Sequence, residues 1–209
     1  MKVYPINLNV ENKKCVVVGG GNVAYRKICG LIDAGAVVEV IAPEICAGIQ
    51  KLIDADKITL IREKFSADKI SDGLILIAAT DDVEVNRIAA LTARTKNFLV
   101  NVVNDFDGDF TVPSKIQRGD FLLTVSTGGN SPAFSKFVRE MLETEFDDNF
   151  GEGLKIIAEF RREVKKILPD SKARTKFWCE VLTPEIWQLL KSGELDKLKK
   201  ILKALSSKL

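Results

Sequence analysis

The stretch Cys15–Ala36, CVVVGGGNVAYRKICGLIDAGA, decides the fold. It opens on an apolar, β-branched run, passes through three consecutive glycines and continues with apolar residues at helical spacing. β-branched residues favour strands, and an apolar residue at every third or fourth position favours a helix with one buried face. The stretch therefore predicts a buried strand, a tight glycine turn and a helix.

The glycine turn fits the pattern G-x-G-x-x-G/A, with Gly19, Gly21 and Ala24 at the three small positions. In a dinucleotide-binding unit the first glycine allows the tight turn, and the second lets the backbone approach a pyrophosphate. The small third residue lets the helix pack on the sheet, and the helix N-terminus faces the anion. The pattern predicts dinucleotide binding, with a purely structural turn as the alternative.

Strands and helices alternate up to about residue 104. The expected strands are Lys14–Val18, Val37–Ile41, Ile58–Ile61, Leu74–Ala78 and Phe98–Val103. The expected helices are Val23–Ala34 and Val83–Thr95, the second with Val85, Ile88, Ala89 and Leu91 on its inner face. Continuous apolar strands separated by helices indicate a parallel sheet covered on both faces. The expected fold class is therefore α/β with a Rossmann-type parallel sheet.

The pattern changes after this alternating part. Leu122–Val125 is the clearest strand, and Ser131, followed by proline at the first helical position, starts a helix that runs to about Thr144. The segment DDNFGEG at 147–153 is interpreted as a linker. The helices expected beyond it are Leu154–Ile167, Ser171–Leu182, Pro184–Leu190 and Leu195–Leu205. We expect a Rossmann domain over 1–112, a small α+β dimerisation region over 113–146 and an all-helical domain over 147–209.

The composition limits the classes of function. The chain has 31 Lys+Arg against 29 Asp+Glu, so its charge favours neither nucleic acid nor a membrane surface as a partner. The N-terminus has no apolar signal core, which makes a cytoplasmic protein the simplest interpretation. The four cysteines show no CxxC spacing and are interpreted as reduced structural thiols. Histidine is absent, so no metal site is predicted and proton transfer would fall to a carboxylate, Lys, Tyr, Cys or water.

The residues at the strand tips bear on the choice of cofactor. A carboxylate at the tip of the second strand binds the ribose of NAD. Glu39 has the usual sequence distance but lies inside that strand, whereas Pro43 and Glu44 follow its tip, where no arginine stands to bind a 2′-phosphate. This favours NAD. Thr80 and Asp81 follow the fourth strand at its carboxyl end, where ligands of such sheets bind. The segment Thr80-Asp81-Asp82 fits the N-cap of the next helix equally well.

Several motifs, in order over residues 1–145, resemble the precorrin-2 dehydrogenase/sirohydrochlorin ferrochelatase family. They are VVVGGGNVAYRK, VIAPE, LILIAATDDVEVN, VNVVND and DFTVPSKIQRGDFLLTVSTGGNSPAFSKFVRE. The block STGGNSPAFSKFVRE is the most specific, since a generic Rossmann protein has no reason to carry it. The resemblance implies a homodimer that oxidises precorrin-2 to sirohydrochlorin with NAD⁺ as hydride acceptor. Some members of the family also insert Fe²⁺.

The resemblance also implies site residues. The implied NAD contacts are Gly19, Gly21, Asn22, Val23, Ala24, Pro43, Glu44, Thr80 and Asp81. The implied contacts to the acidic tetrapyrrole are Ser126, Thr127, Gly128, Asn130 and Ser131, in a loop that ends at a helix N-terminus and so favours anions. Four cations are nearby in sequence: Lys115, Arg118, Lys136 and Arg139. For each of them, a solvated surface residue is preferred as the interpretation over a substrate contact.

The end of the fifth strand departs from the family pattern. Family members have aspartate where this chain has Asn104, and that aspartate is implicated in proton removal and in metal insertion. Asn104 cannot act as a carboxylate base. Asp105 comes one residue later, and Asp107 or Asp109 could also reach the site from the following loop. Hydride transfer needs mainly juxtaposition of cofactor and macrocycle, so dehydrogenase activity survives this change more readily than chelatase activity.

Two other hypotheses remain open. A non-catalytic protein that binds tetrapyrrole and NAD(H), and hands the substrate to a separate chelatase, is supported by Asn104. A different NAD-dependent oxidoreductase on the same Rossmann half is opposed by the STGGNSP segment. Cofactor binding without any turnover would identify the non-catalytic binding protein. Failure to bind any tetrapyrrole would identify the other oxidoreductase.

Overall fold

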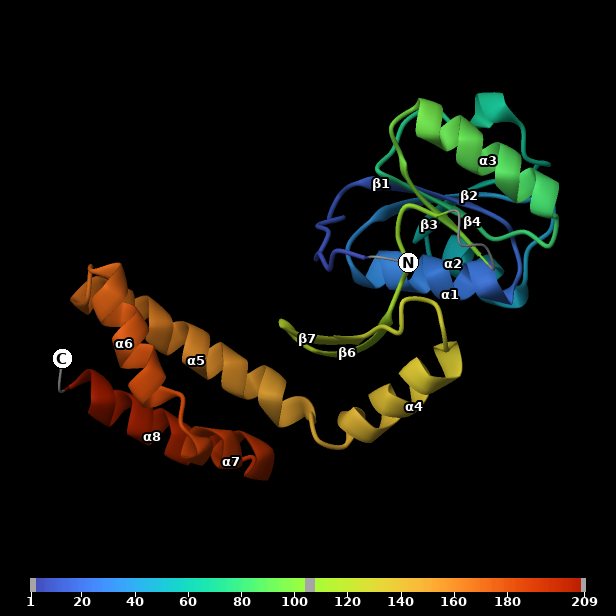
Figure 1. Cartoon of the computed structure of the whole chain (residues 1–209). Coiled ribbons are helices and arrows are strands. Elements are labelled where there is room, and N and C mark those ends of the chain that lie inside the picture. Colours follow the sequence, from blue (N-terminus) through green and yellow to red (C-terminus); the bar gives the residue numbers. More distant parts are fainter. Residues whose placement is uncertain (1–2, 104–107, 208–209) are drawn as a thin grey trace. The chain divides into compact units, whose positions relative to one another are not determined.

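The computed structural model describes residues 3–103 and 108–207, in two compact units that run from Met1 to Val112 and from Pro113 to Leu209 (Figure 1). The predictions made for Asn104 and Asp105 lie outside the described residues.

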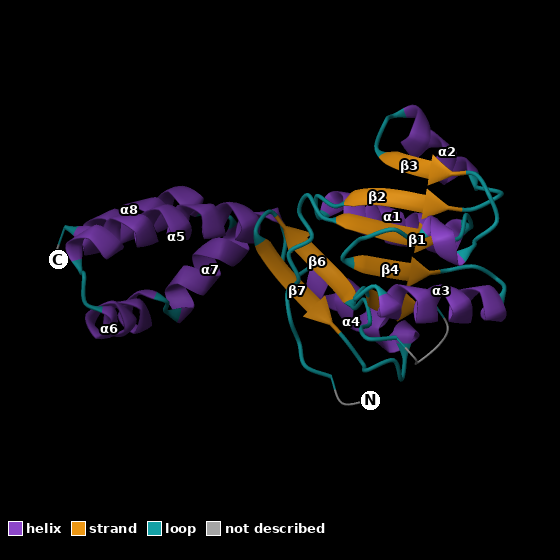
Figure 2. Cartoon of the chain, turned by 90° about the horizontal axis from the view of Figure 1, so that it is seen from above, coloured by secondary structure: helices purple, strands orange, loops and turns teal. Residues whose placement is uncertain are grey.

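The first unit is built on one parallel sheet. Its strands are β1 (Lys14–Val18), β2 (Val37–Ile41), β3 (Ile58–Ile61), β4 (Ile75–Ala78) and β5 (Leu99–Val102). They lie in the order β3-β2-β1-β4-β5, all parallel (Figure 2). The chain leaves β1 toward β2 and later crosses to β4 on the other side, so the strand order reverses at β1. Ligands of open parallel sheets bind beyond the carboxyl ends of the strands at such a reversal.

Helices cover both faces of this sheet. They are α1 (Asn22–Asp33), α2 (Ala47–Asp54) and α3 (Val83–Thr95), with a short 3₁₀ turn η1 (Ala67–Lys69). Alternate residues of β1 enter two cores: Cys15 and Val17 pack on the α1 and α2 side, and Val16 and Val18 on the α3 side. Burial raises the pKa of the Cys15 thiol to about 11. The prediction of an α/β fold with this sheet is confirmed.

The inner face expected for α3 is partly wrong. Ile88 and Leu91 are exposed, and the buried positions are Asn86, Ala89, Ala90 and Ala93. Small alanine side chains let this helix lie close to the sheet, so its larger apolar residues are displaced toward the flanks. Helix α2 was not predicted from the sequence.

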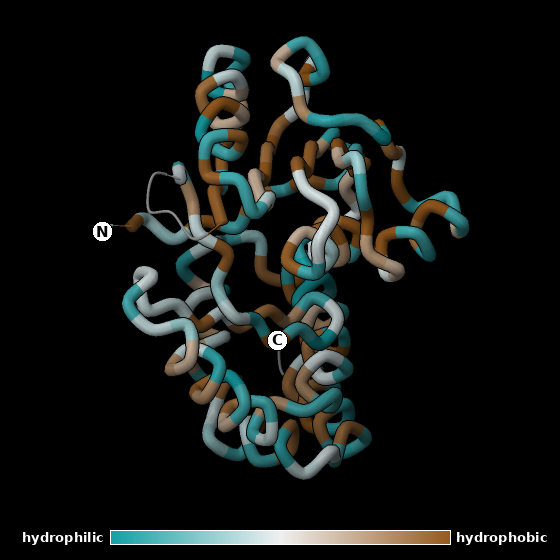
Figure 3. Tube along the Cα trace, turned by 90° about the vertical axis from the view of Figure 1, so that its right-hand side faces the viewer, coloured by the Kyte–Doolittle hydropathy of each residue, from teal (hydrophilic) through white to brown (hydrophobic). Residues whose placement is uncertain are grey.

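The second unit joins a hairpin to a set of helices. It contains the antiparallel strands β6 (Ser114–Arg118) and β7 (Phe121–Val125) and the helices α4 (Pro132–Glu143), α5 (Asp148–Ile167), α6 (Ser171–Val181), α7 (Pro184–Ser192) and α8 (Leu195–Ser206). The helical C-terminal part is thereby confirmed. Hydrophilic and hydrophobic residues alternate along these helices (Figure 3). Helices α5 to α8 share a core that includes Phe160, Val164, Leu198 and Leu202. Within residues 3–103 and 108–207, no helix combines the length and apolar character of a membrane span.

The linker expected at 147–153 is wrong, because this segment forms the start of α5. Asp147 caps the helix by accepting a hydrogen bond from the Asn149 backbone N–H at 3.0 Å. Gly151 and Gly153 lie inside the helix where neighbours approach closely. A Cβ at Gly151 would lie 2.5 Å from the Arg118 carbonyl oxygen, and one at Gly153 would lie 2.0 Å from a Leu190 methyl group. The glycines that suggested a flexible linker serve close packing instead.

Candidate functional site

Gly19 fixes the glycine loop between β1 and α1. Its φ of +128° favours glycine, and a Cβ there would lie 2.4 Å from the Ala79 carbonyl oxygen. Its backbone N–H donates to the Ile41 carbonyl at 3.0 Å. The loop is therefore tied to the end of β2 on one side and packs against the segment after β4 on the other.

The loop between β2 and α2 packs on the same glycines. A Cβ at Gly20 would lie 1.8 Å from the Glu44 carbonyl oxygen, so only glycine fits there. The Cys46 backbone N–H donates to the Gly20 carbonyl at 2.8 Å. Pro43 and Glu44 are exposed at this edge. The segments that contain the predicted cofactor residues thus meet at the carboxyl end of β1.

Gly21 differs from its two neighbours because nothing in the protein requires a glycine there. Its φ of −82° suits any residue, and a Cβ would meet no atom within 4 Å. Gly21 is the N-cap of α1 and offers no side chain to the first turn, which also contains no acidic residue. The backbone N–H groups of Asn22, Val23 and Ala24 belong to this turn and point along the helix toward its N-terminus. An open space with a partial positive charge fits a pyrophosphate.

Thr80 follows β4 and lies against the glycine loop, on the side opposite β2. Its backbone N–H and hydroxyl donate to the Oδ1 atom of Asn86 at 3.0 and 2.7 Å, and its carbonyl accepts from Nδ2 at 2.9 Å. Asp82, not Asp81, caps α3, accepting from the backbone N–H groups of Glu84 and Val85. Asn86 was not predicted from the sequence. A polar residue one helical turn after the cap was the available signal.

The ribose-binding carboxylate was ambiguous in the sequence. Glu39 forms an ion pair with Lys14 at 3.0 Å inside the sheet, away from the carboxyl ends of the strands. Glu44 lies at the tip and is exposed. Arg62 follows β3 beside this tip, and its guanidinium donates to the Gln50 side chain at 3.1 Å. Glu44 is therefore the better placed of the two carboxylates.

Hydrogen bonds fix the chain just before and just after residues 104–107, next to β5. The Val103 backbone N–H donates to the Ala78 carbonyl at the end of β4, at 2.9 Å. After the gap, Asp109 accepts from the Val100 backbone N–H through Oδ2 at 2.9 Å and lies 3.6 Å from the Arg94 guanidinium. The Asn101 side chain donates to the Phe110 carbonyl at 2.9 Å. The Asp109 carboxylate is thus engaged in holding this segment along β5.

In the second unit, the loop before α4 has its polar groups bonded to one another. The Thr127 hydroxyl accepts from the Ser131 backbone N–H and lies 3.1 Å from both the Ser131 carbonyl and the Ser135 hydroxyl. Ser131 caps the helix by accepting from the Phe134 backbone N–H at 3.2 Å, which confirms the predicted start of α4. Asn130 donates to the Thr127 carbonyl at 2.9 Å. These side chains fix the loop before they could contact a ligand.

The other members of this loop complete its turn. Ser126 accepts from the Gly128 backbone N–H at 3.2 Å, and Gly128 has a φ of +60°. The nearby cations have protein partners. The Arg118 Nε atom lies 3.2 Å from Asp148, and Arg139 pairs with Glu140 at 3.1 Å.

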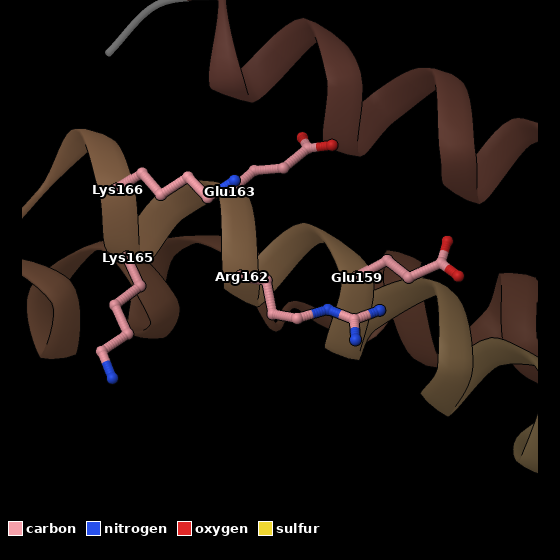
Figure 4. Close-up of a pocket in the computed structure, with 5 residues that line it drawn as sticks. All are labelled: Glu159, Arg162, Glu163, Lys165 and Lys166. Atoms are coloured by element: carbon pink, nitrogen blue, oxygen red, sulfur yellow. The ribbon is translucent and has the colours of Figure 1, made fainter.

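A hollow on the surface of α5 is lined by none of these residues. Its lining consists of the exposed side chains of Glu159, Arg162, Glu163, Lys165 and Lys166 (Figure 4). Five flexible charged side chains from one helix do not form a fixed site, because each loses rotamer freedom on binding. None of the predicted site residues belongs to it.

Two family models match the chain. The model described as "Putative NAD(P)-binding" matches residues 6–114, and the model described as "Sirohaem synthase dimerisation region" matches residues 149–205. The name of the second model falls on α5–α8, whereas the sequence analysis expected the dimerisation region at 113–146.

Similar proteins agree with these models. The siroheme synthase of Methylococcus capsulatus is 37% identical over 203 residues, which cover 97% of this chain and 43% of the relative. That of Nitrosococcus oceani is 36% identical over 205 residues, covering 98% and 44%. The chain thus spans less than half the length of these curated relatives.

A solved structure is similar over nearly its whole length. It is described as SirC, precorrin-2 dehydrogenase, and it has a TM-score of 0.75, 27% identity, and coverage of 95% of this chain and 99% of that one. The parallel sheet, the glycine loop and the two matched models occur together in one chain. This protein therefore belongs to the precorrin-2 dehydrogenase family, with an NAD(P)-binding domain and a sirohaem synthase dimerisation region.

Proposed function

We propose that this protein is an NAD-dependent precorrin-2 dehydrogenase of sirohaem biosynthesis. The observation that carries the proposal is the open space at Gly21, because the protein itself gives no reason for a glycine there. Membership of the precorrin-2 dehydrogenase family supports the choice of substrate.

The cofactor would lie across the carboxyl ends of β1, β2 and β4. The first turn of α1 would bind the pyrophosphate through its backbone N–H groups. Glu44 would accept hydrogen bonds from the adenosine ribose, which favours NAD over NADP because a 2′-phosphate would face a carboxylate. The segment at Thr80 and Asp81 would lie under the nicotinamide half. Bound NAD⁺ supplies a hydride acceptor.

The reaction removes one hydride and one proton from precorrin-2, and the products are sirohydrochlorin, NADH and H⁺. Asp105 is the proposed acceptor of the proton, since Asn104 has no carboxylate. Both residues lie outside the described part of the chain. The residue before them, Val103, donates its backbone N–H to the Ala78 carbonyl at the end of β4. The Asp109 carboxylate already accepts a backbone hydrogen bond and is a poor candidate for the base.

The loop at 126–131 is proposed to bind the carboxylates of precorrin-2. The observation in its favour is the α4 N-terminus, where backbone N–H groups attract anions. Because the Thr127 and Ser131 hydroxyls have protein partners, they are proposed to shape the loop. Its backbone N–H groups and the second Nδ2 hydrogen of Asn130, whose first hydrogen is donated to the Thr127 carbonyl, are proposed to contact the substrate.

The protein is proposed to act as a homodimer whose interface includes α4. Phe134, Phe137 and Met141 leave 57%, 57% and 59% of their surface exposed on this helix. They lie at i, i+3 and i+7, which places them on one face. A Phe137→Asp substitution is expected to give monomers in analytical ultracentrifugation. Leu182→Asp, at an exposed position within 149–205, tests the region that the second family model names, and monomers from this variant with an intact dimer in Phe137→Asp would overturn the assignment to α4.

An anaerobic assay with enzymatically generated precorrin-2 tests the function. Wild-type protein with NAD⁺ is expected to form NADH and sirohydrochlorin in equal amounts, and Asp105→Ala is expected to lose this activity. Asp109→Asn keeps a hydrogen-bond acceptor for Val100 and is expected to retain turnover within about threefold. Added Fe²⁺ tests metal insertion, and NADP⁺ tests the choice of cofactor.

Asn104 favours a second candidate, a protein that binds NAD(H) and tetrapyrrole without turnover. The same assay separates the two. Binding of both ligands with no NADH formed would identify the carrier, and no tetrapyrrole binding would refute both.

A further inference from the structure

One buried side-chain amide forms its hydrogen bonds with the segment that follows β4. Asn86 lies in the first turns of α3 with only 5% of its surface exposed. Its Oδ1 atom accepts from the backbone N–H and the hydroxyl of Thr80, and its Nδ2 atom donates to the Thr80 carbonyl. A single side chain therefore binds both backbone polar groups of one loop residue, as a neighbouring strand would.

The start of α3 does not need these bonds. Asp82 already caps the helix, accepting from the Glu84 and Val85 backbone N–H groups at 2.9 and 3.1 Å. Asn86 also joins the helix normally through its own backbone N–H, which donates to the Asp82 carbonyl at 3.1 Å. The side chain of Asn86 thus binds the Thr80 backbone without taking part in the cap. The Thr80 hydroxyl also lies 2.9 Å from the Asp82 carbonyl and 3.2 Å from the Asp82 backbone N–H, and both of these are main-chain contacts that a change of the Asp82 side chain leaves in place.

Thr80 lies directly against the glycine loop. A Cβ at Gly19 would be 3.1 Å from the Thr80 backbone nitrogen and 2.4 Å from the Ala79 carbonyl oxygen. The Ala79 backbone N–H donates to the Val18 carbonyl at 2.8 Å, which joins this segment to the end of β1. The position of Thr80 therefore sets one wall of the crevice at which the strand order reverses.

We infer that Asn86 is a positioning residue for the cofactor: by holding the Thr80 backbone, it shapes the wall under the nicotinamide half of the dinucleotide. The inference rests on the proposed cofactor site. The adenosine half lies on the β2 side of the glycine loop and the nicotinamide half on the β4 side, because each half of the dinucleotide occupies one side of the reversal. Loss of the Asn86 side chain is expected to weaken binding of the nicotinamide half selectively.

The experiment titrates the full chain with NAD⁺ and with ADP, which contains the adenosine and the phosphates but no nicotinamide. For Asn86→Ala we expect the Kd for NAD⁺ to rise about tenfold while the Kd for ADP changes by less than about twofold. Asp82→Ala is the matched control, since it removes the helix cap and leaves the Asn86 contacts. It is expected to lower the melting temperature and to leave both Kd values within about twofold.

The outcomes separate a positioning role from a structural one. Equal weakening of NAD⁺ and ADP in Asn86→Ala would show a general loss of structure and would overturn the inference. Unchanged NAD⁺ binding in Asn86→Ala, or the same selective loss in Asp82→Ala, would overturn it as well, with the proposed function intact. Failure of the wild-type protein to bind any of NAD⁺, NADP⁺ or ADP would refute the proposed function and the inference together.

Discussion

The glycine-containing loops before α1 and α4, one in each unit, differ in what their polar groups contact. Before α1, Gly21 caps the helix without a side chain, and the space beside it is open. Before α4, Ser131 caps the helix and Thr127 bonds to both Ser131 and Ser135. The first loop thus leaves the N-terminus of its helix uncapped by a side chain, whereas the second uses Ser131 and Thr127 to cap its helix and fix its own turn.

The difference also bears on how motifs are interpreted. The segment STGGNSP carries the most specific part of the resemblance, yet the hydroxyls of Thr127 and Ser131 hold the loop together. A specific motif can therefore reflect the requirements of a loop as much as those of a ligand. Many proteins share the glycine pattern at 19–24. In this pattern, however, no contact within the protein requires a glycine at Gly21, so a ligand is the better reason for it.

The largest effect on stability is expected at Gly19. Gly19→Ala places a Cβ 2.4 Å from the Ala79 carbonyl oxygen on a backbone with a φ of +128°, and we expect a loss of about 3 kcal/mol or more in the free energy of unfolding. Gly30→Ala is the control. It lies inside α1, where a Cβ meets nothing within 4 Å, and should stabilise by about 0.5–1 kcal/mol. Similar urea midpoints for the two variants would contradict this account of the loop.

A smaller effect is expected in the second loop. Thr127→Val removes the hydroxyl that bonds to Ser131 and Ser135 and should lower the free energy of unfolding by about 1–3 kcal/mol, because the half-buried Ser131 and the buried Ser135 each lose a hydrogen bond. Thr127→Ser keeps the hydroxyl and should remain within about 1 kcal/mol of wild type. Urea unfolding monitored by circular dichroism measures both. If the Thr127→Val protein were as stable as the Thr127→Ser protein, the Thr127 hydroxyl would not stabilise this loop.

The smallest effect concerns pH and the buried Cys15 in β1. Burial raises the pKa of its thiol to about 11, above its ordinary value of 9.0. The folded state keeps the proton while the unfolded state loses it, so this contribution is complete below about pH 9 and is lost as the pH rises toward 11. We expect the free energy of unfolding to fall by about 1–2 kcal/mol more in wild type than in Cys15→Ala over this range. Parallel pH profiles would contradict it.

Local patterns were sufficient to predict most of the first unit. Buried β-branched runs place β1, β2 and β3 at their observed bounds, and α3 begins and ends as expected. Long-range contacts decide what the patterns missed. Gly151 and Gly153 suggested a linker because the approach of Arg118 and Leu190 cannot be inferred from neighbouring residues. The bonds from Asn86 to Thr80 likewise depend on how α3 lies on the sheet.

The most direct test of the account is a single substitution at Gly21. Gly21→Ala is expected to fold normally, with a melting temperature at most about 4 °C below wild type, because its Cβ enters open space. The same methyl group would occupy the place of the pyrophosphate, so calorimetric titration should show NAD⁺ binding weakened by about a hundredfold or more. Wild-type affinity for NAD⁺ in a folded Gly21→Ala protein would contradict the assignment of this loop as the cofactor site.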